Sequence, residues 1–197
     1  MMSSLEIQII DYFYPREAGG VLREILLQHS ICVRDKALAL LDSLEDGELK
    51  RSISPEVIRT GSMLHDLGIR YCHAPSIHCT GEEPYLAHGR IGADLLRQYG
   101  RERDLDLECY ARICERHTGA GLTEEEIRKN VLPLPAKDFL PETPEEKLIC
   151  LADKFFSKSG DMEEKSLSRI RRSMEKFGPA VLKRFEELCL LFHVETE

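Results

Sequence analysis

The sequence has no apolar run of about 18 residues, the length that a helix needs to cross a membrane. Residues 1–11 also lack a basic region followed by an apolar stretch and a small-residue cleavage site, so we do not expect a signal peptide. The chain has seven cysteines, an odd number, and none of them forms a Cys-x-x-Cys pair. Several lie at the spacing of a helix core, which favours reduced, buried thiols and a cytoplasmic location.

An excess of positive charge is also missing. The chain has 27 basic and 35 acidic residues and a formal net charge of -8. Binding to long nucleic acid needs a basic surface, so we expect neither a nucleic-acid nor a membrane partner. A small phosphorylated substrate is compatible with this charge, because a bound metal ion supplies local positive charge.

Convincing alternation of apolar and polar residues, the pattern of a half-buried strand, is absent, and so are internal repeats. Apolar residues recur instead at a spacing of three and four, which predicts an all-α protein. With 197 residues, a hydrophobic fraction of 42% and a charged fraction of 31%, we expect one globular domain. The clearest predicted helices are residues 21–44, 55–68, 85–99, 105–117, 162–177 and 179–194, with further helices after Thr123 and Thr143.

Local signals place the ends of these helices. Ser54 followed by a proline predicts an N-cap, and Thr123 and Thr143 each begin a capping box. We predict a break in the first helix at or near His29, and Gly68 as the C-terminal glycine of the second.

Residues that can bind metal recur on these helices. His65 and Asp66 are adjacent in an otherwise mostly apolar stretch, and both are suitable ligands for a divalent cation. A single histidine on an apolar helix face is more often a hydrogen-bonded core residue than a ligand. The chain nevertheless supplies four further candidates on other helices, and a helical bundle can gather such residues at its centre. These are His29, His88, His117 and Asp153.

The order of these six residues resembles the HD superfamily of metal-dependent phosphohydrolases, in its small stand-alone HDIG-type branch. The box reads His65-Asp66-Leu67-Gly68, and the resemblance covers about residues 20–160. It implies an HD-domain helical bundle, with residues 161–197 adding two C-terminal helices to a single domain of residues 1–197. Arg116 precedes His117 where some two-metal branches have a second histidine.

The resemblance also implies the chemistry. One metal would be held by His29, His65, Asp66 and Asp153, and a second by His88 and His117, with Asp66 bridging both and acting as the catalytic residue. Nitrogen and carboxylate ligands suit Fe, Mn, Ni, Co or Mg, and zinc is also allowed. Metal-activated hydroxide would then hydrolyse a phosphate ester, such as a nucleotide or another small phosphorylated metabolite. With one metal, His88 and His117 become substrate-contacting or acid–base residues.

Two further questions stay open at this level. Arg70, His78 and Lys137 lie beside the motifs, and we predict that they contact the substrate, although surface charge is the simpler interpretation of each. A structural zinc at Cys72-His73 and His78-Cys79 is disfavoured by its spacing.

Two alternatives to hydrolysis are an HD-type di-iron oxygenase that acts on a small organic substrate and a regulatory module without activity. Neither the substrate nor the oligomeric state follows from the sequence.

Overall fold

A computed structural model describes residues 2–17 and 20–194 of the chain. Residues 1, 18–19 and 195–197 of the predicted domain lie outside this described part. Within it the protein has ten α-helices, which confirms the predicted all-α class, and no helix there is long and apolar enough to cross a membrane. The helices are α1 (Ser4–Phe13), α2 (Gly20–Ser43), α3 (Glu48–Ser52), α4 (Pro55–Leu64), α5 (His88–Arg103), α6 (Glu108–Arg116), α7 (Glu124–Lys129), α8 (Pro144–Asp153), α9 (Leu167–Glu175) and α10 (Pro179–Leu191).

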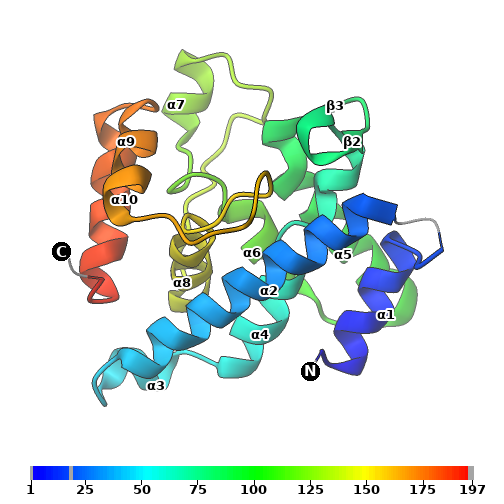
Figure 1. The fold of residues 1–197 in the computed structure, drawn as a ribbon, viewed down its shortest axis with the longest axis horizontal. Coiled ribbons are helices and arrows are strands. Elements are labelled where there is room, and N and C mark those ends of the chain that lie inside the picture. The colour runs from blue at the N-terminus through cyan, green and yellow to red at the C-terminus, as the bar shows by residue number, and fades with distance from the viewer. Residues whose placement is uncertain (1, 18–19, 195–197) are drawn as a thin grey trace.

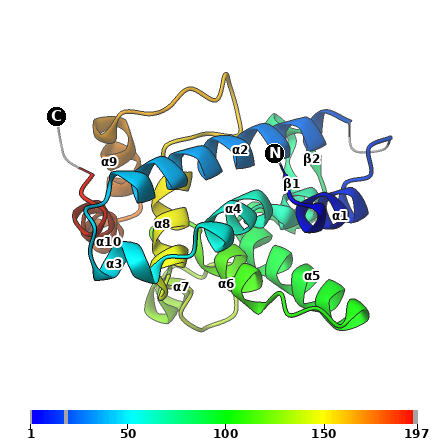
Figure 2. The same cartoon turned by 90° about the horizontal axis from the view of Figure 1, so that it is seen from below.

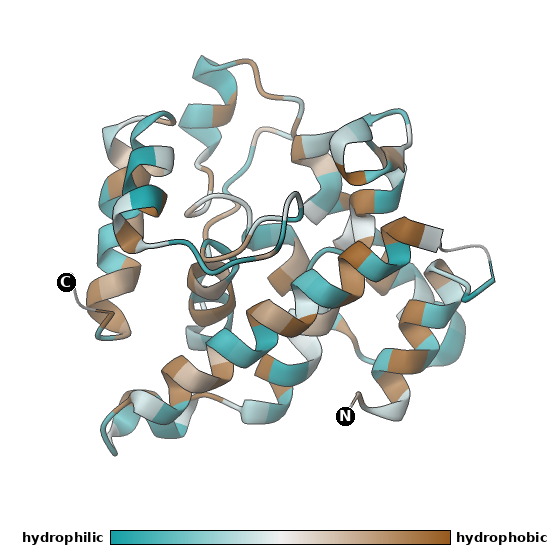
Figure 3. Cartoon of the chain, in the orientation of Figure 1, coloured by the Kyte–Doolittle hydropathy of each residue, from teal (hydrophilic) through white to brown (hydrophobic). Residues whose placement is uncertain are grey.

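Helix α2 runs across one face of the molecule (Figure 1). Helices α4 and α8 pack against it, and α6 packs against both of them, while α5 packs on α6 at the side away from α2 (Figure 2). Hydrophilic and hydrophobic residues alternate along α2, as expected for a helix with one buried face (Figure 3). The buried apolar residues of that face are Leu26, Val33, Ala37 and Leu41.

The two C-terminal helices continue the same core. Helix α9 packs on α10, and α10 packs on α8. Phe185 and Phe192 are completely buried there and belong to the hydrophobic cluster that also contains residues of α2 and α4. The segment that joins α8 to α9, residues 154–166, loops out beside α2 and returns to α9 (Figure 1), and Lys36 of α2 pairs with Glu164 in this segment.

The predicted helix starts at the three caps are confirmed. The side chain of Ser54 accepts a hydrogen bond from the amide of Val57, and Pro55 is the first residue of α4. Thr123 and Thr143 each form a complete capping box, at the starts of α7 and α8. Each cap satisfies backbone amides that have no partner within the helix.

Several predicted boundaries are wrong, among them those of the helix predicted at 85–99, which as α5 runs from His88 to Arg103. Helix α2 is continuous through His29, because no glycine or proline interrupts it there and facing carboxylates accommodate the buried imidazole. Helix α4 ends at Leu64, and Gly68 lies in the following 3-10 turn, where it permits close contact with α5. Helix α9 begins only at Leu167, since Ser166 caps it.

A small sheet was not predicted. Strand β1 (Cys72–Ala74) pairs antiparallel with β2 (Cys79–Thr80) and parallel with β3 (Glu83–Pro84). Strands of two or three residues are too short to show alternation. Three 3-10 turns flank them, η1 (Leu67–Tyr71), η2 (Pro75–Ile77) and η3 (Tyr85–Ala87), and η3 leads directly into α5.

Candidate metal centre

The six predicted ligands come from five helices and meet in the interior. His29 lies in the middle of α2, and the other five lie at helix ends or directly after them. His65 caps α4 and Asp66 follows it, His88 is the first residue of α5, His117 caps α6, and Asp153 is the last residue of α8. All six are buried, with at most 8% of any residue exposed.

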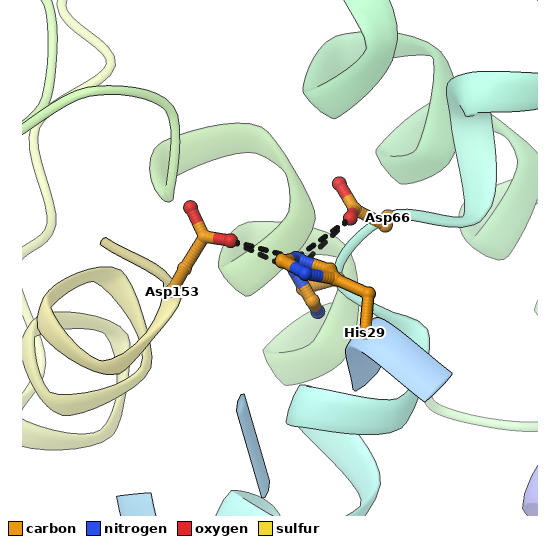
Figure 4. A group of neighbouring side chains, drawn as sticks. His29, Asp66 and Asp153 are labelled. Atoms are coloured by element: carbon orange, nitrogen blue, oxygen red, sulfur yellow. Dashed lines mark hydrogen bonds and ion pairs between the residues drawn. The ribbon is translucent and has the colours of Figure 1, made fainter. Parts of the chain in front are cut away.

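The first group surrounds one oxygen of Asp66. The Oδ2 atom of Asp66 lies 3.3 Å from His29 Nε2 and 3.2 Å from His65 Nε2. On the other side of both rings, Asp153 Oδ1 lies 2.9 Å from His29 Nε2 and 3.5 Å from His65 Nε2. Figure 4 shows the imidazole of His29 between the two carboxylates. Four potential ligand atoms thus lie within 4.8 Å of one another.

The second group surrounds the other oxygen of the same carboxylate. The Oδ1 atom of Asp66 lies 3.4 Å from His88 Nε2 and 3.4 Å from His117 Nε2. These two nitrogens are 3.0 Å apart. Asp66 therefore offers one oxygen to each group, as a carboxylate that bridges two ions would.

Backbone carbonyls orient three of the imidazoles. The Nδ1 atoms of His65, His88 and His117 lie 2.7, 2.6 and 2.8 Å from the carbonyl oxygens of Ser62, Tyr85 and Cys114. Because a carbonyl only accepts, each Nδ1 carries a proton and donates it, and each Nε2 is directed at the centre, where it can bind either a metal ion or a second proton. A hydrogen bond of this kind fixes the tautomer and orientation of metal-binding histidines.

The fit to a metal ion can be judged from atoms that lack partners. His65 Nε2 and Asp66 Oδ1 are buried and have no hydrogen-bond partner among the described residues. The Nε2 atoms of His88 and His117 face each other as two lone pairs, an arrangement that is repulsive without a cation between them. Buried polar atoms in native proteins are almost always satisfied, so this donor set fits divalent ions better than an ion-free core.

The titration of the site leads to the same interpretation. Burial lowers the pKa of His29 to about 4 and that of His88 to about 3, which keeps both rings neutral and able to bind metal. Burial also opposes a charge on His65, but the carboxylates of Asp66 and Asp153 outweigh it and raise its pKa to about 9. A position that draws a proton onto a buried imidazole draws a divalent cation for the same electrostatic reason.

Two lysines that were not among the predicted site residues also lie at the centre. Lys154 Nζ lies 2.6 Å from Asp153 Oδ2 and donates to the His117 carbonyl at 3.1 Å. Lys158 Nζ lies 2.7 Å from Asp66 Oδ2. Lys154 follows Asp153 directly, which is a usable signal, whereas nothing in the spacing of Lys158 distinguishes it from a surface lysine.

A cavity of about 640 Å³ opens beside Asp153. Both lysines of the centre line it, and so does Tyr85, whose ring stacks on that of His88 with 4.8 Å between the ring centroids. Of the six candidate ligands Asp153 lines the cavity, so a small molecule within it would lie beside this edge of the centre.

The three residues predicted to contact the substrate do not line this cavity. The guanidinium of Arg70 donates to the carbonyl of Phe13, and so faces α1. Lys137 Nζ pairs with Glu115 Oε1 at 2.7 Å, and His78 is exposed in a left-handed conformation between η2 and β2. The structure therefore brings the six predicted ligands together and leaves Arg70, His78 and Lys137 apart from them.

Comparison with known proteins agrees with the arrangement of the site. Residues 26–157 match the family described as HD domain. An uncharacterized protein of Methanocaldococcus jannaschii is 35% identical over 130 residues, which cover 66% of this chain and 65% of that protein. Two proteins named tRNA (cytidine(56)-2'-O)-methyltransferase, from Picrophilus torridus and Thermoplasma volcanium, are 31% and 28% identical over 134 residues, 68% of this chain but only 32% of each of those proteins. No solved structure gives a significant match.

Proposed function

The chain belongs to the HD domain family, and on that premise we propose that it is a metal-dependent phosphohydrolase that acts on a nucleotide or another small phosphorylated metabolite. The proposal rests on the positions of the two carboxylate oxygens of Asp66, each of which faces a different group of histidines. Its Oδ2 atom belongs to a group with His29 and His65, and its Oδ1 atom to a group with His88 and His117. Two divalent ions held in this way would polarise a phosphate ester and activate water near neutral pH.

The residues around the ligands favour an anionic substrate. Lys154 and Lys158 place two ammonium groups at the junction of the metal ligands and the cavity. Burial raises the pKa of Asp66, but the charges of His65 and Lys158 outweigh burial and hold this pKa well below its usual range. The carboxylate is therefore ionised at any pH at which the enzyme would work, and is ready to hold cations.

The size of the cavity and the charge of the chain favour a small substrate. A volume of about 640 Å³ lies within the usual range for small-molecule sites, roughly 300–1,000 Å³. The net charge of -8 disfavours long nucleic acid as a partner. Methyl transfer is not part of the proposal, because this chain aligns with only 32% of each protein that carries the methyltransferase name.

A di-iron oxygenase is the second candidate, because four histidines and two aspartates also suit a pair of iron ions. The lysines that line the cavity favour an anionic substrate, which agrees with a phosphate ester and limits the oxygenase alternative to an organic substrate that carries negative charge. The two functions differ in one simple observable, the consumption of oxygen.

The test is metal analysis of anaerobically purified protein combined with a screen of phosphorylated metabolites. We expect two ions per chain and release of inorganic phosphate from at least one nucleotide or sugar phosphate. Asp66→Ala should abolish both, whereas Asp94→Ala, an exposed carboxylate on α5 with 58% of its side chain accessible, should change neither. Oxygen consumption without phosphate release would favour the oxygenase, and an active Asp66→Ala variant would refute both assignments.

A further inference from the structure

The lining of the cavity beside the metal centre has two chemically different parts. Lysines 154, 158 and 165 form the charged end, where Lys154 pairs with Asp153. Helix α9 and the segment after α7 form a mainly apolar part, which we call the apolar end. It includes Leu132, Ile170, Met174 and Phe177, together with the polar residues Ser173 and Lys176. A ligand that fills the cavity therefore needs an anionic group at one end and an apolar surface at the other.

Lys165 differs from the other two lysines of the charged end. Lys154 and Lys158 pair with the carboxylates of metal ligands. Lys165 is half-buried and lines the cavity, and among the described residues no carboxylate lies within 4.0 Å of its Nζ atom. Its backbone is held in place, because its amide donates to the Phe155 carbonyl at 2.8 Å.

A half-buried ammonium without a counter-ion is unfavourable in the free protein. Burial lowers the pKa of Lys165 to about 8. The charge of Asp153 opposes this shift, and the charges of Lys154, Arg169 and Lys158 add to it. Such a group gains free energy when an anion takes the missing place. The unmet charge therefore points to an anionic ligand within the cavity.

We propose that Lys165 binds the phosphate group of the substrate, and that the apolar end of the cavity holds an aromatic or otherwise apolar organic part of the same molecule. This inference rests on the proposed phosphohydrolase function and narrows its substrate class. It selects phosphoesters with a planar or apolar group, such as a nucleobase, over those that carry only hydroxyl groups. Helix α9, which supplies apolar residues to the cavity, then contributes to the choice of substrate.

Phe177 is the residue of the apolar end that tests this most safely. Its side chain lines the cavity at the end of α9, yet the residue is 68% exposed. An exposed phenylalanine beside a cavity supplies a flat surface on which an aromatic group can stack. Because it is not part of the buried core, its truncation should leave the fold intact.

The charged end is tested by calorimetric titration of the Mn²⁺-loaded protein with inorganic phosphate. We expect Lys165→Met to weaken binding by about 10–100-fold, as for loss of a charge-assisted hydrogen bond, and Lys165→Arg to restore most of it. The matched control is Lys183→Met on α10, whose side chain is 78% exposed and which lies outside the cavity lining. No binding by the parent protein, or equal binding by Lys165→Met and the parent, would overturn the proposal.

The apolar end is tested with two phosphonates that cannot be hydrolysed as esters. Phenylphosphonate and methylphosphonate share the anionic group and differ in the aromatic ring. We expect the parent protein to prefer phenylphosphonate by roughly tenfold, and Phe177→Ala to lose a large part of that preference while binding methylphosphonate normally. Leu190→Ala, at an exposed position on α10 with 80% of the residue accessible, serves as the control. Equal affinity of the parent for the two compounds would refute the apolar half of the proposal.

These binding measurements separate this inference from the proposed function. If phosphoesters are hydrolysed but Lys165→Met retains the parent KM and phosphate affinity, the function stands and this inference fails. If Lys165 and Phe177 behave as expected in binding but no phosphoester is hydrolysed, the ligand assignment stands and the hydrolase proposal fails.

Discussion

Gly68 allows the box that carries His65 and Asp66 to lie directly against α5. A Cβ atom at this position would collide with the carbonyl of His88 and stand 2.6 Å from the Gly92 amide nitrogen, where ordinary contacts begin at 3.4 Å. Gly68→Ala must therefore move the two backbones apart by at least about 0.8 Å at Gly92, the difference between these distances, and by more at the His88 carbonyl. Backbone cannot yield as the end of a flexible side chain can.

The displacement has two expected consequences. Overpacking of this kind costs roughly 1–3 kcal/mol and sometimes more, so we expect a loss of about 3 kcal/mol in the free energy of unfolding. For a chain of this length that lowers Tm by roughly 6–12 °C. Metal–ligand distances tolerate only about 0.2 Å, so a shift of His88 should also remove the second ion while the group around His29 keeps the first.

Thermal unfolding by circular dichroism and metal analysis measure the two effects. Gly100→Ala is the matched control for the metal, because its Cβ would stand 2.6 Å from the Leu105 carbonyl oxygen, away from the metal ligands, and should lower Tm without loss of an ion. Gly47→Ala, whose nearest atom would be 3.8 Å away, should change little. A Gly68→Ala variant with the Tm of the parent and two bound ions would refute this reasoning.

Three other perturbations test the centre. His88→Ala should reduce Mn²⁺ from two ions per chain to about one by plasma emission analysis; two ions in the variant would remove His88 from the ligand set. Lys158→Met removes a cation 2.7 Å from Asp66 Oδ2, so the variant should bind Mn²⁺ at least tenfold more tightly in calorimetry. It should also lose turnover, because phosphate binds more weakly. Weaker metal binding by the variant would contradict this expectation. Removal of the bound ions by a chelator should lower Tm by roughly 5–10 °C, since ions present at 100 times their Kd stabilise the folded protein by about 2.7 kcal/mol. An unchanged Tm would indicate that the buried ligands are satisfied without metal.

Much of the metal centre could be predicted because its residues carry local signals. His65 and Asp66 are adjacent in the sequence, and the capping box at Thr143 fixes the start of the helix that ends at Asp153. Hydrophobic periodicity likewise predicts most helices, since burial of one face repeats along the chain. These features depend on short stretches of sequence, which can be interpreted without knowledge of the fold.

The surroundings of the centre could not be predicted, because they depend on how distant segments pack. Arg70 lies four residues after Asp66, but the turn η1 directs its side chain toward Phe13 on α1. Lys158 and Lys165 lie in an irregular segment, and only the path of that segment past the metal ligands brings them to the cavity. Proximity in sequence thus pointed to Arg70, which does not line the cavity, and concealed Lys158 and Lys165, which do.

The proposed function depends on Asp66 lying between two metal ions. Anomalous diffraction at the manganese edge from crystals grown with Mn²⁺ examines this point. We expect two peaks about 3.5–4 Å apart, one beside Asp66 Oδ2 with His29 and His65, the other beside Oδ1 with His88 and His117. A single peak, or two peaks of which only one contacts Asp66, would contradict it.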